Sequence, residues 1–146
     1  MIIAPLALIL VSGAGCHSNR MPLGWPDAKI KPPSGSATKR VYSMPGWWLI
    51  LFDSQMTWEE VRRDLEGKLE TEHYALVRGH AITGIPEGEL GKSYLSPDGL
   101  LEVTLRARSA MENAIALPNV SADYWLGIER YGSPSPDLKH AEPLAE

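Results

Sequence analysis

Residues 47–60 read WWLILFDSQMTWEE, and this stretch joins a buried strand to the start of a helix. The run from Trp47 to Phe52 is entirely apolar, which is typical of a central strand covered on both faces. Asp53 and Ser54 end the run. We therefore expect a strand over residues 47–52 in the middle of a sheet.

A helix is predicted over residues 57–70 by its capping residues and by the spacing of its apolar residues. Thr57 is suited to cap the first turn, and Glu60 is placed three residues later to return the capping bond. Apolar residues then recur at intervals of three and four, and they form one stripe that needs a surface to cover. These residues are Trp58, Val61, Leu65 and Leu69. Two charged pairs four residues apart are expected on the exposed side, Arg62/Glu66 and Asp64/Lys68.

Further strands are expected over residues 39–43, 74–78, 101–108 and 124–131, with a turn at 96–99. The strand at 101–108 alternates most clearly, and it predicts a sheet with one solvent-exposed face. Its apolar side is Leu101, Val103, Leu105 and Ala107, and its polar side is Glu102, Thr104, Arg106 and Arg108. Residues 109–119 fit either a helical turn or a loop. The order of elements predicts an α+β fold, a mostly antiparallel sheet of four to five strands with one amphipathic helix on one face.

Length and composition indicate one globular domain without a nucleic-acid partner. The chain has 146 residues, and its 44% hydrophobic and 22% charged residues disfavour wholesale disorder or a coiled coil. The net charge of -4 does not suit binding to nucleic acid by bulk charge. A single cysteine supplies neither an internal disulfide nor a cysteine-rich zinc site. We expect no cofactor and no metal.

Two segments flank the expected domain at residues 38–132. Residues 16–37 are rich in Pro and Gly and read as a semi-extended tether. Trp25 is the exception in this segment, since its side chain suits either docking on the domain or a lipid interface. Residues 133–146 follow a Gly-Ser-Pro stretch and are expected to form a flexible tail.

The first 15 residues, MIIAPLALILVSGAG, contain no charged side chain. The apolar run from Ile2 to Val11 is too short to cross a bilayer, which needs about 20 residues, but it suits the apolar region of a secretory signal. Small residues occupy positions 12–15, and the only cysteine, Cys16, follows at once. We therefore predict a signal peptide over residues 1–15.

This arrangement resembles a bacterial lipoprotein signal, in which small residues precede a cysteine whose thiol receives a diacylglyceryl group and which becomes the new N-terminus. The resemblance implies cleavage between Gly15 and Cys16 and lipidation of Cys16. It also implies a protein anchored to the cell membrane or the outer membrane and facing the periplasm or the exterior. An uncleaved N-terminal anchor and a buried first strand remain alternatives. The segment from Trp25 to Tyr74 is similar to a module of exported bacterial proteins of unknown activity, which implies a small α+β envelope domain.

The leading functional prediction is a non-catalytic binding or accessory role in the cell envelope. The partners expected are the membrane, through the lipid anchor, and an envelope protein or glycan. Trp47, Trp48 and Trp125 are candidates for a binding surface for a sugar or a peptide. Since Trp47 and Trp48 point to opposite faces of one strand, the alternative is that other parts of the chain cover them.

A small hydrolase or metal-dependent enzyme is the alternative function. It would use His73 and His80, with Glu70 or Glu72 nearby, as a weak metal or acid/base site. The spacing of these residues fits no strong template, and solvated surface histidines are the favoured explanation. No catalytic residue is therefore assigned from the sequence.

Overall fold

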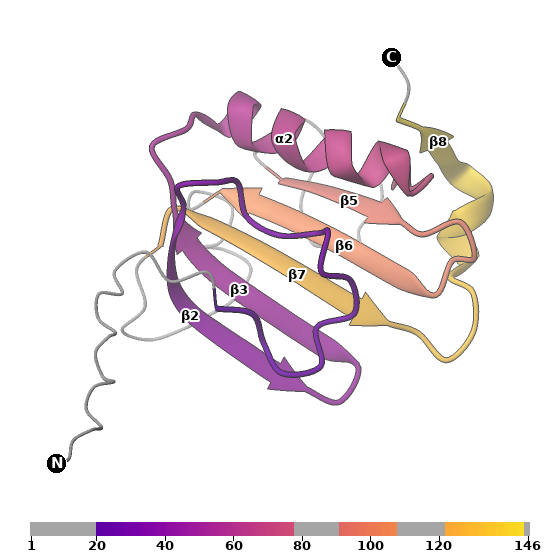
Figure 1. The fold of residues 1–146 in the computed structure, drawn as a ribbon. Coiled ribbons are helices and arrows are strands. Elements are labelled where there is room, and N and C mark those ends of the chain that lie inside the picture. The colour runs from indigo at the N-terminus through magenta and orange to yellow at the C-terminus, as the bar shows by residue number, and fades with distance from the viewer. Residues whose placement is uncertain (1–19, 78–90, 108–121, 145–146) are drawn as a thin grey trace, which may run out of the picture.

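The computed structural model describes residues 20–77, 91–107 and 122–144. Within these residues the chain forms one antiparallel sheet of seven strands, ordered β2-β3-β7-β6-β5-β4-β8, with one α-helix, α2, across one face (Figure 1). The predicted α+β class is confirmed, and the sheet has more strands than the four to five expected. The elements are β2 (Ala37–Met44), β3 (Trp47–Asp53), α2 (Trp58–Thr71), β4 (Ala75–Val77), β5 (Gly91–Leu95), β6 (Leu101–Ala107), β7 (Tyr124–Arg130), the 3-10 helix η2 (Pro136–His140) and β8 (Ala141–Pro143).

The β2–β3 hairpin forms one edge of the sheet. Met44 pairs with Trp47 across a turn in which Gly46 has a φ of 75°, a conformation that favours glycine. On its other side β3 pairs with β7, and the residues of β3 from Trp48 to Phe52 are buried. The predicted central strand is therefore confirmed.

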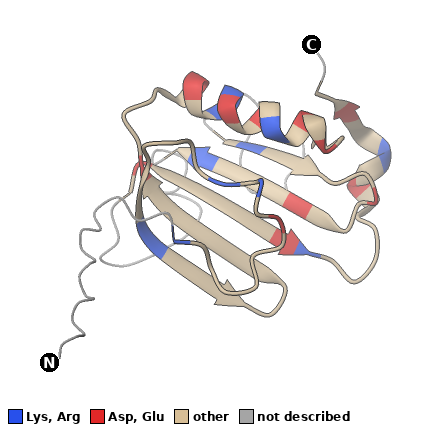
Figure 2. Cartoon of the chain, viewed as in Figure 1, with Lys and Arg blue, Asp and Glu red and all other residues tan. Residues whose placement is uncertain are grey.

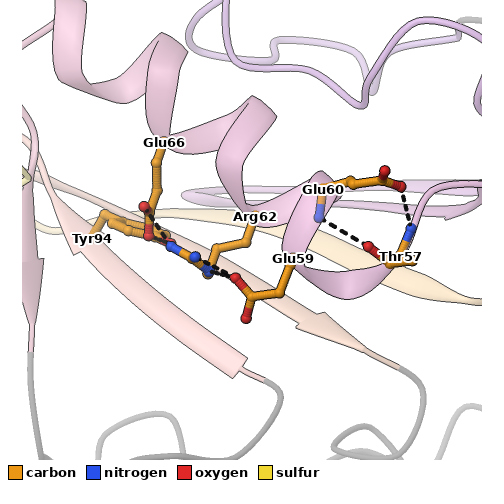
Figure 3. Close-up of polar contacts among 6 residues, drawn as sticks. All are labelled: Thr57, Glu59, Glu60, Arg62, Glu66 and Tyr94. Carbon is orange, nitrogen blue, oxygen red and sulfur yellow. Dashed lines mark hydrogen bonds and ion pairs between the residues drawn. The ribbon is translucent and has the colours of Figure 1, made fainter.

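Helix α2 begins at the predicted cap. The Thr57 hydroxyl accepts a hydrogen bond from the Glu60 backbone N–H at 3.2 Å, and the Glu60 carboxylate accepts one from the Thr57 N–H at 2.9 Å (Figure 3). This reciprocal pair satisfies two amides that have no partner inside the helix. The apolar stripe is buried against the sheet at Val61, Leu65 and Leu69.

The main core lies between the sheet and the elements on its helix face. Side chains from β3, β5, β6 and β7 join the stripe of α2 in one cluster. Alternate residues of β6 contribute to it, as the sequence pattern predicts, and they are Val103, Leu105 and Ala107. On the opposite face a smaller cluster contains Leu49, Leu51, Ala122 and Trp125.

Residues 20–36 pack on the helix face of the sheet, so the tether predicted for residues 16–37 is wrong over this part. Ile30 is fully buried in the main core, and the Trp25 indole N–H donates to the Ile30 carbonyl at 2.8 Å. An ion pair of 3.1 Å joins Lys29 to Glu72 at the end of the helix. Pro and Gly prevent regular structure here, but a buried isoleucine and a docked tryptophan still fix the segment.

The C-terminal segment is also ordered through residue 144, which corrects the flexible tail predicted for residues 133–146. The Ser135 hydroxyl accepts from the Asp137 N–H at 3.2 Å and caps η2. Strand β8 then pairs with β4, with Glu142 opposite Leu76. Because β4 offers an otherwise open backbone edge, even three residues can add to the sheet. The sequence pattern missed both β8 and β5.

Candidate functional site

The three tryptophans predicted as a binding surface do not form one platform. Trp48 lies on the helix face in the main core, where its indole N–H donates to the Leu23 carbonyl at 3.1 Å. Trp47 and Trp125 lie on the opposite face, where Trp125 is buried and Trp47 is partly exposed. Residues 20–36 therefore cover Trp48, which was the alternative to an exposed binding surface.

Trp125 is held between a cation and a glycine. The guanidinium carbon of Arg106, on the neighbouring strand, lies 4.2 Å from the centre of the Trp125 ring. A Cβ built on Gly127 would come within 2.8 Å of the indole nitrogen of Trp125. Because Gly127 has no side chain, it leaves room for the indole of Trp125. The sequence offers one signal for this contact, a glycine inside an otherwise apolar strand.

The sheet face opposite the helix carries a buried polar row on β6, which contradicts the solvent-exposed face predicted from the alternation. Glu102 is 4% exposed and Arg106 is 7% exposed. The Tyr131 hydroxyl donates to one oxygen of Glu102, and the Thr104 and Ser93 hydroxyls lie 3.2 Å apart. The pattern separates the two faces of β6 correctly, but it cannot tell whether the polar face reaches water.

Burial shifts the titration of the groups in and around this row. Burial lowers the pKa of Arg106, and the nearby Glu102 carboxylate acts in the opposite direction. Glu129 pairs with Glu102 across β6 and β7, and burial followed by repulsion from Glu102 raises the pKa of Glu129. Burial and the hydrogen bond to Glu102 raise the pKa of Tyr131.

Only part of the histidine site predicted for an enzyme lies in the described residues. His73 is exposed just after α2 and has a positive φ of 64°. Glu72 is paired with Lys29, and Glu70 is exposed. Residues 20–77, 91–107 and 122–144 contain no group of three or more potential metal ligands. His80 lies outside the described residues, as do Gly15 and Cys16.

A polar network connects α2 to the sheet. The hydroxyl of Tyr94, on β5, donates to Glu66 at 2.8 Å, and Arg62 donates to the other oxygen of Glu66, also at 2.8 Å (Figure 3). Arg62 also pairs with Glu59. Burial, and then the charge of Glu66, raises the pKa of Tyr94. Since Tyr94 is fully buried in the sheet and its hydroxyl donates to a residue of α2, this network fixes the helix on the sheet.

Two apolar side chains are strongly exposed near the turn of the β2–β3 hairpin. Leu23 is 87% exposed and Met44 is 51% exposed, and these are the exposed large hydrophobic residues of the described part. The Ser43 hydroxyl donates to the Leu23 carbonyl at 2.5 Å. The segment that contains Leu23 therefore lies beside the end of β2, which contains Met44. We define residues 21–25 together with residues 43–47 as the hairpin tip. Both stretches lack charged residues, but nothing in the sequence pattern shows that they lie side by side.

Charged side chains are distributed unevenly over the fold. Figure 2 shows acidic and basic residues along α2, whereas the turn of the β2–β3 hairpin is uncharged. Arg130 brings a cation close to this turn, since its backbone N–H donates to the Gly46 carbonyl at 2.8 Å. Its guanidinium carbon lies 5.5 Å from the centre of the Trp48 ring. The hairpin tip is therefore an apolar surface with two charged neighbours, Arg130 beside Trp48 and Glu129 opposite Trp47.

Comparisons with known proteins give no relative for this chain: no family model, curated protein or solved structure matches it. Within the residues that the structure describes, no helix is long and apolar enough to cross a membrane.

Proposed function

We propose that this chain is an exported lipoprotein, held to a membrane of the bacterial envelope by lipid on Cys16, with a non-catalytic binding or accessory role. The observation that carries the proposal is the uncharged stretch of residues 1–15, whose small residues stand directly before the only cysteine. In the proposed mature protein Cys16 is the first residue. The domain then faces the periplasm or the exterior.

The packing of residues 20–36 supports a domain held close to its anchor. Arg20 is the first residue described, and its segment continues onto the sheet through Leu23 and Ile30. Arg20 is four positions after Cys16, a stretch that spans at most about 14 Å when fully extended. The proposed lipid and the folded domain are therefore separated by a short connection.

The buried and partly buried charged residues take part in contacts within the fold, and this favours a binding role over catalysis. Arg106 is stacked on Trp125, Glu102 accepts from Tyr131, and Glu66 is shared by Tyr94 and Arg62. Such contacts stabilise a fold, and they leave these groups engaged with each other. The partner we propose, besides the membrane, is an envelope protein or glycan.

Intact mass spectrometry of the protein from a detergent-extracted membrane fraction tests the anchor. We expect a chain that begins at Cys16 and carries a diacylglyceryl group, with or without a further acyl chain. Cys16→Ala is expected to abolish this modification, whereas the control variant Ser18→Ala keeps it. An unmodified chain that includes residues 1–15 and is recovered in the soluble fraction would overturn the proposal.

A further inference from the structure

The backbone around Leu23 is fixed although its side chain is exposed. The Leu23 carbonyl accepts two hydrogen bonds, from Ser43 at 2.5 Å and from the Trp48 indole at 3.1 Å. These contacts hold Leu23 on the helix face of the hairpin with its side chain in solvent, whereas Met44, which pairs with Trp47, is exposed on the opposite face. The turn of the hairpin therefore has an exposed apolar side chain on each of its two sides, and exposed apolar surface is a feature of sites that bind a protein or a membrane.

The position of the hairpin tip relative to Cys16 indicates which partner this is. Leu23 follows Cys16 by seven residues, so a lipid on Cys16 lies within about 25 Å of Leu23 at full extension. The tip belongs to the β2 edge of the sheet, and six strand spacings, about 29 Å, separate β2 from β8. The edge at β2 therefore faces the anchored membrane more readily than the edge at β8.

The distribution of charge along the chain favours the same orientation. Residues 1–53, which end with β3, contain five Lys or Arg and two acidic residues, Asp27 and Asp53, although the whole chain has a net charge of -4. Lys39 pairs with Asp53 at 3.5 Å. The remaining residues, 54–146, contain nine Lys or Arg and 16 Asp or Glu. Basic residues close to a bilayer are attracted to anionic lipids, and acidic residues are repelled. Arg40 adds an exposed cation on the edge strand itself.

We propose that the hairpin tip lies in the lipid surface to which the chain is anchored, with Leu23 and Met44 inserted among the lipids. This inference rests on the proposed lipid anchor. Partly exposed aromatic residues flank the inserted side chains, and tryptophan and tyrosine favour the boundary between lipid and water. These residues are Trp25, Tyr42 and Trp47. The domain is then oriented with its β2 edge toward the membrane and its β8 edge away from it.

Site-directed fluorescence on the full-length lipoprotein tests this orientation. Since lipidation consumes the thiol of Cys16, a cysteine introduced at Leu23→Cys or Met44→Cys is the one free thiol, and a polarity-sensitive dye is attached to it. Lys139→Cys is the matched control, because Lys139 is exposed on η2 beside the β8 edge. Each labelled protein is reconstituted into vesicles of phosphatidylethanolamine, with or without phosphatidylglycerol, that carry nitroxide-labelled lipids.

We expect the dyes at positions 23 and 44 to emit at shorter wavelength and to be quenched at least twofold by the nitroxide lipids. We expect the dye at position 139 to be unquenched, and phosphatidylglycerol to increase quenching at positions 23 and 44. Equal quenching at all three positions in an acylated protein overturns the inference alone. A blue-shifted but unquenched dye indicates a protein partner at the tip and also overturns it. An unacylated chain, identified by its mass, overturns the proposed function and this inference with it.

Discussion

Glu102 and Glu129 stand directly opposite each other on β6 and β7, on the sheet face that is turned away from the helix. Two carboxylates at paired positions repel when both are charged. Burial is the larger cause of the raised pKa of Glu129, and repulsion from Glu102 adds to it. The carboxyl of Glu129 therefore holds its proton to a higher pH than a free glutamate does.

A pH dependence of stability follows from this pair. The folded state holds the Glu129 proton to a higher pH than the unfolded chain, so its stabilising effect is complete below the unfolded pKa and is lost as the pH rises through the folded pKa. We expect Glu129→Gln to match the parent protein in urea unfolding near about pH 4 and to exceed its stability near about pH 7. Glu70→Gln, at an exposed position, serves as the control. A Glu129→Gln protein less stable than the parent near neutral pH would contradict the argument.

A second prediction concerns the hydrogen bond between Tyr94 and Glu66. Tyr94→Phe removes the donor from a buried contact to a carboxylate, and we expect a loss of about 1–2 kcal/mol in the free energy of unfolding. Glu66→Gln leaves one acceptor oxygen for two donors, the Tyr94 hydroxyl and Arg62, so it is also expected to be destabilising. Chemical denaturation of both variants makes the comparison. Equal stability of Tyr94→Phe and the parent would show that this bond does not help to hold α2 on the sheet.

Alanine substitutions at two glycines are expected to change the stability of the protein in opposite directions. Gly127→Ala would place a Cβ 2.8 Å from the Trp125 indole nitrogen, so the ring must move, and we expect a loss of about 1–3 kcal/mol. Gly67→Ala lies in α2 with nothing within 4 Å of its Cβ, and we expect a gain of about 0.5–1 kcal/mol from helix propensity. Thermal unfolding and tryptophan fluorescence measure both effects. The assignment of Gly127 as the space for Trp125 fails if Gly127→Ala leaves the fluorescence spectrum and the stability unchanged.

The parts of the fold that could be predicted from sequence are those fixed by local chemistry. The buried strand β3 follows from an apolar run, and α2 follows from the Thr57 cap and its apolar stripe. The two faces of β6 follow from alternation, but the burial of its polar face depends on contacts from other strands, such as the stacking of Arg106 on Trp125. Residue type alone does not report such contacts.

The same limit explains the errors at the two ends of the domain. Strand β8 has three residues and exists because β4 offers it a partner, which no pattern within residues 141–143 records. Similarly, a single buried side chain, Ile30, attaches a segment whose Pro and Gly content suggests a free linker. The exposed pair Leu23 and Met44 is 21 residues apart in sequence, and only the folded backbone brings its two segments together.

The last prediction concerns Ile30 and tests whether residues 20–36 belong to the folded domain. Ile30→Ala removes a fully buried side chain from the main core, and we expect a loss of about 2–5 kcal/mol in the free energy of unfolding. Leu23→Ala, in the same segment, removes a side chain that is 87% exposed, so we expect a change within about 0.5 kcal/mol. Urea denaturation of the two variants gives the comparison. If both substitutions were equally neutral, the segment would contribute nothing to the fold, and the domain would begin near residue 38 as its composition suggests. A large effect of Ile30→Ala alone would mean that the folded body already includes residue 30, 14 positions after Cys16, and the proposed membrane orientation needs such a short connection.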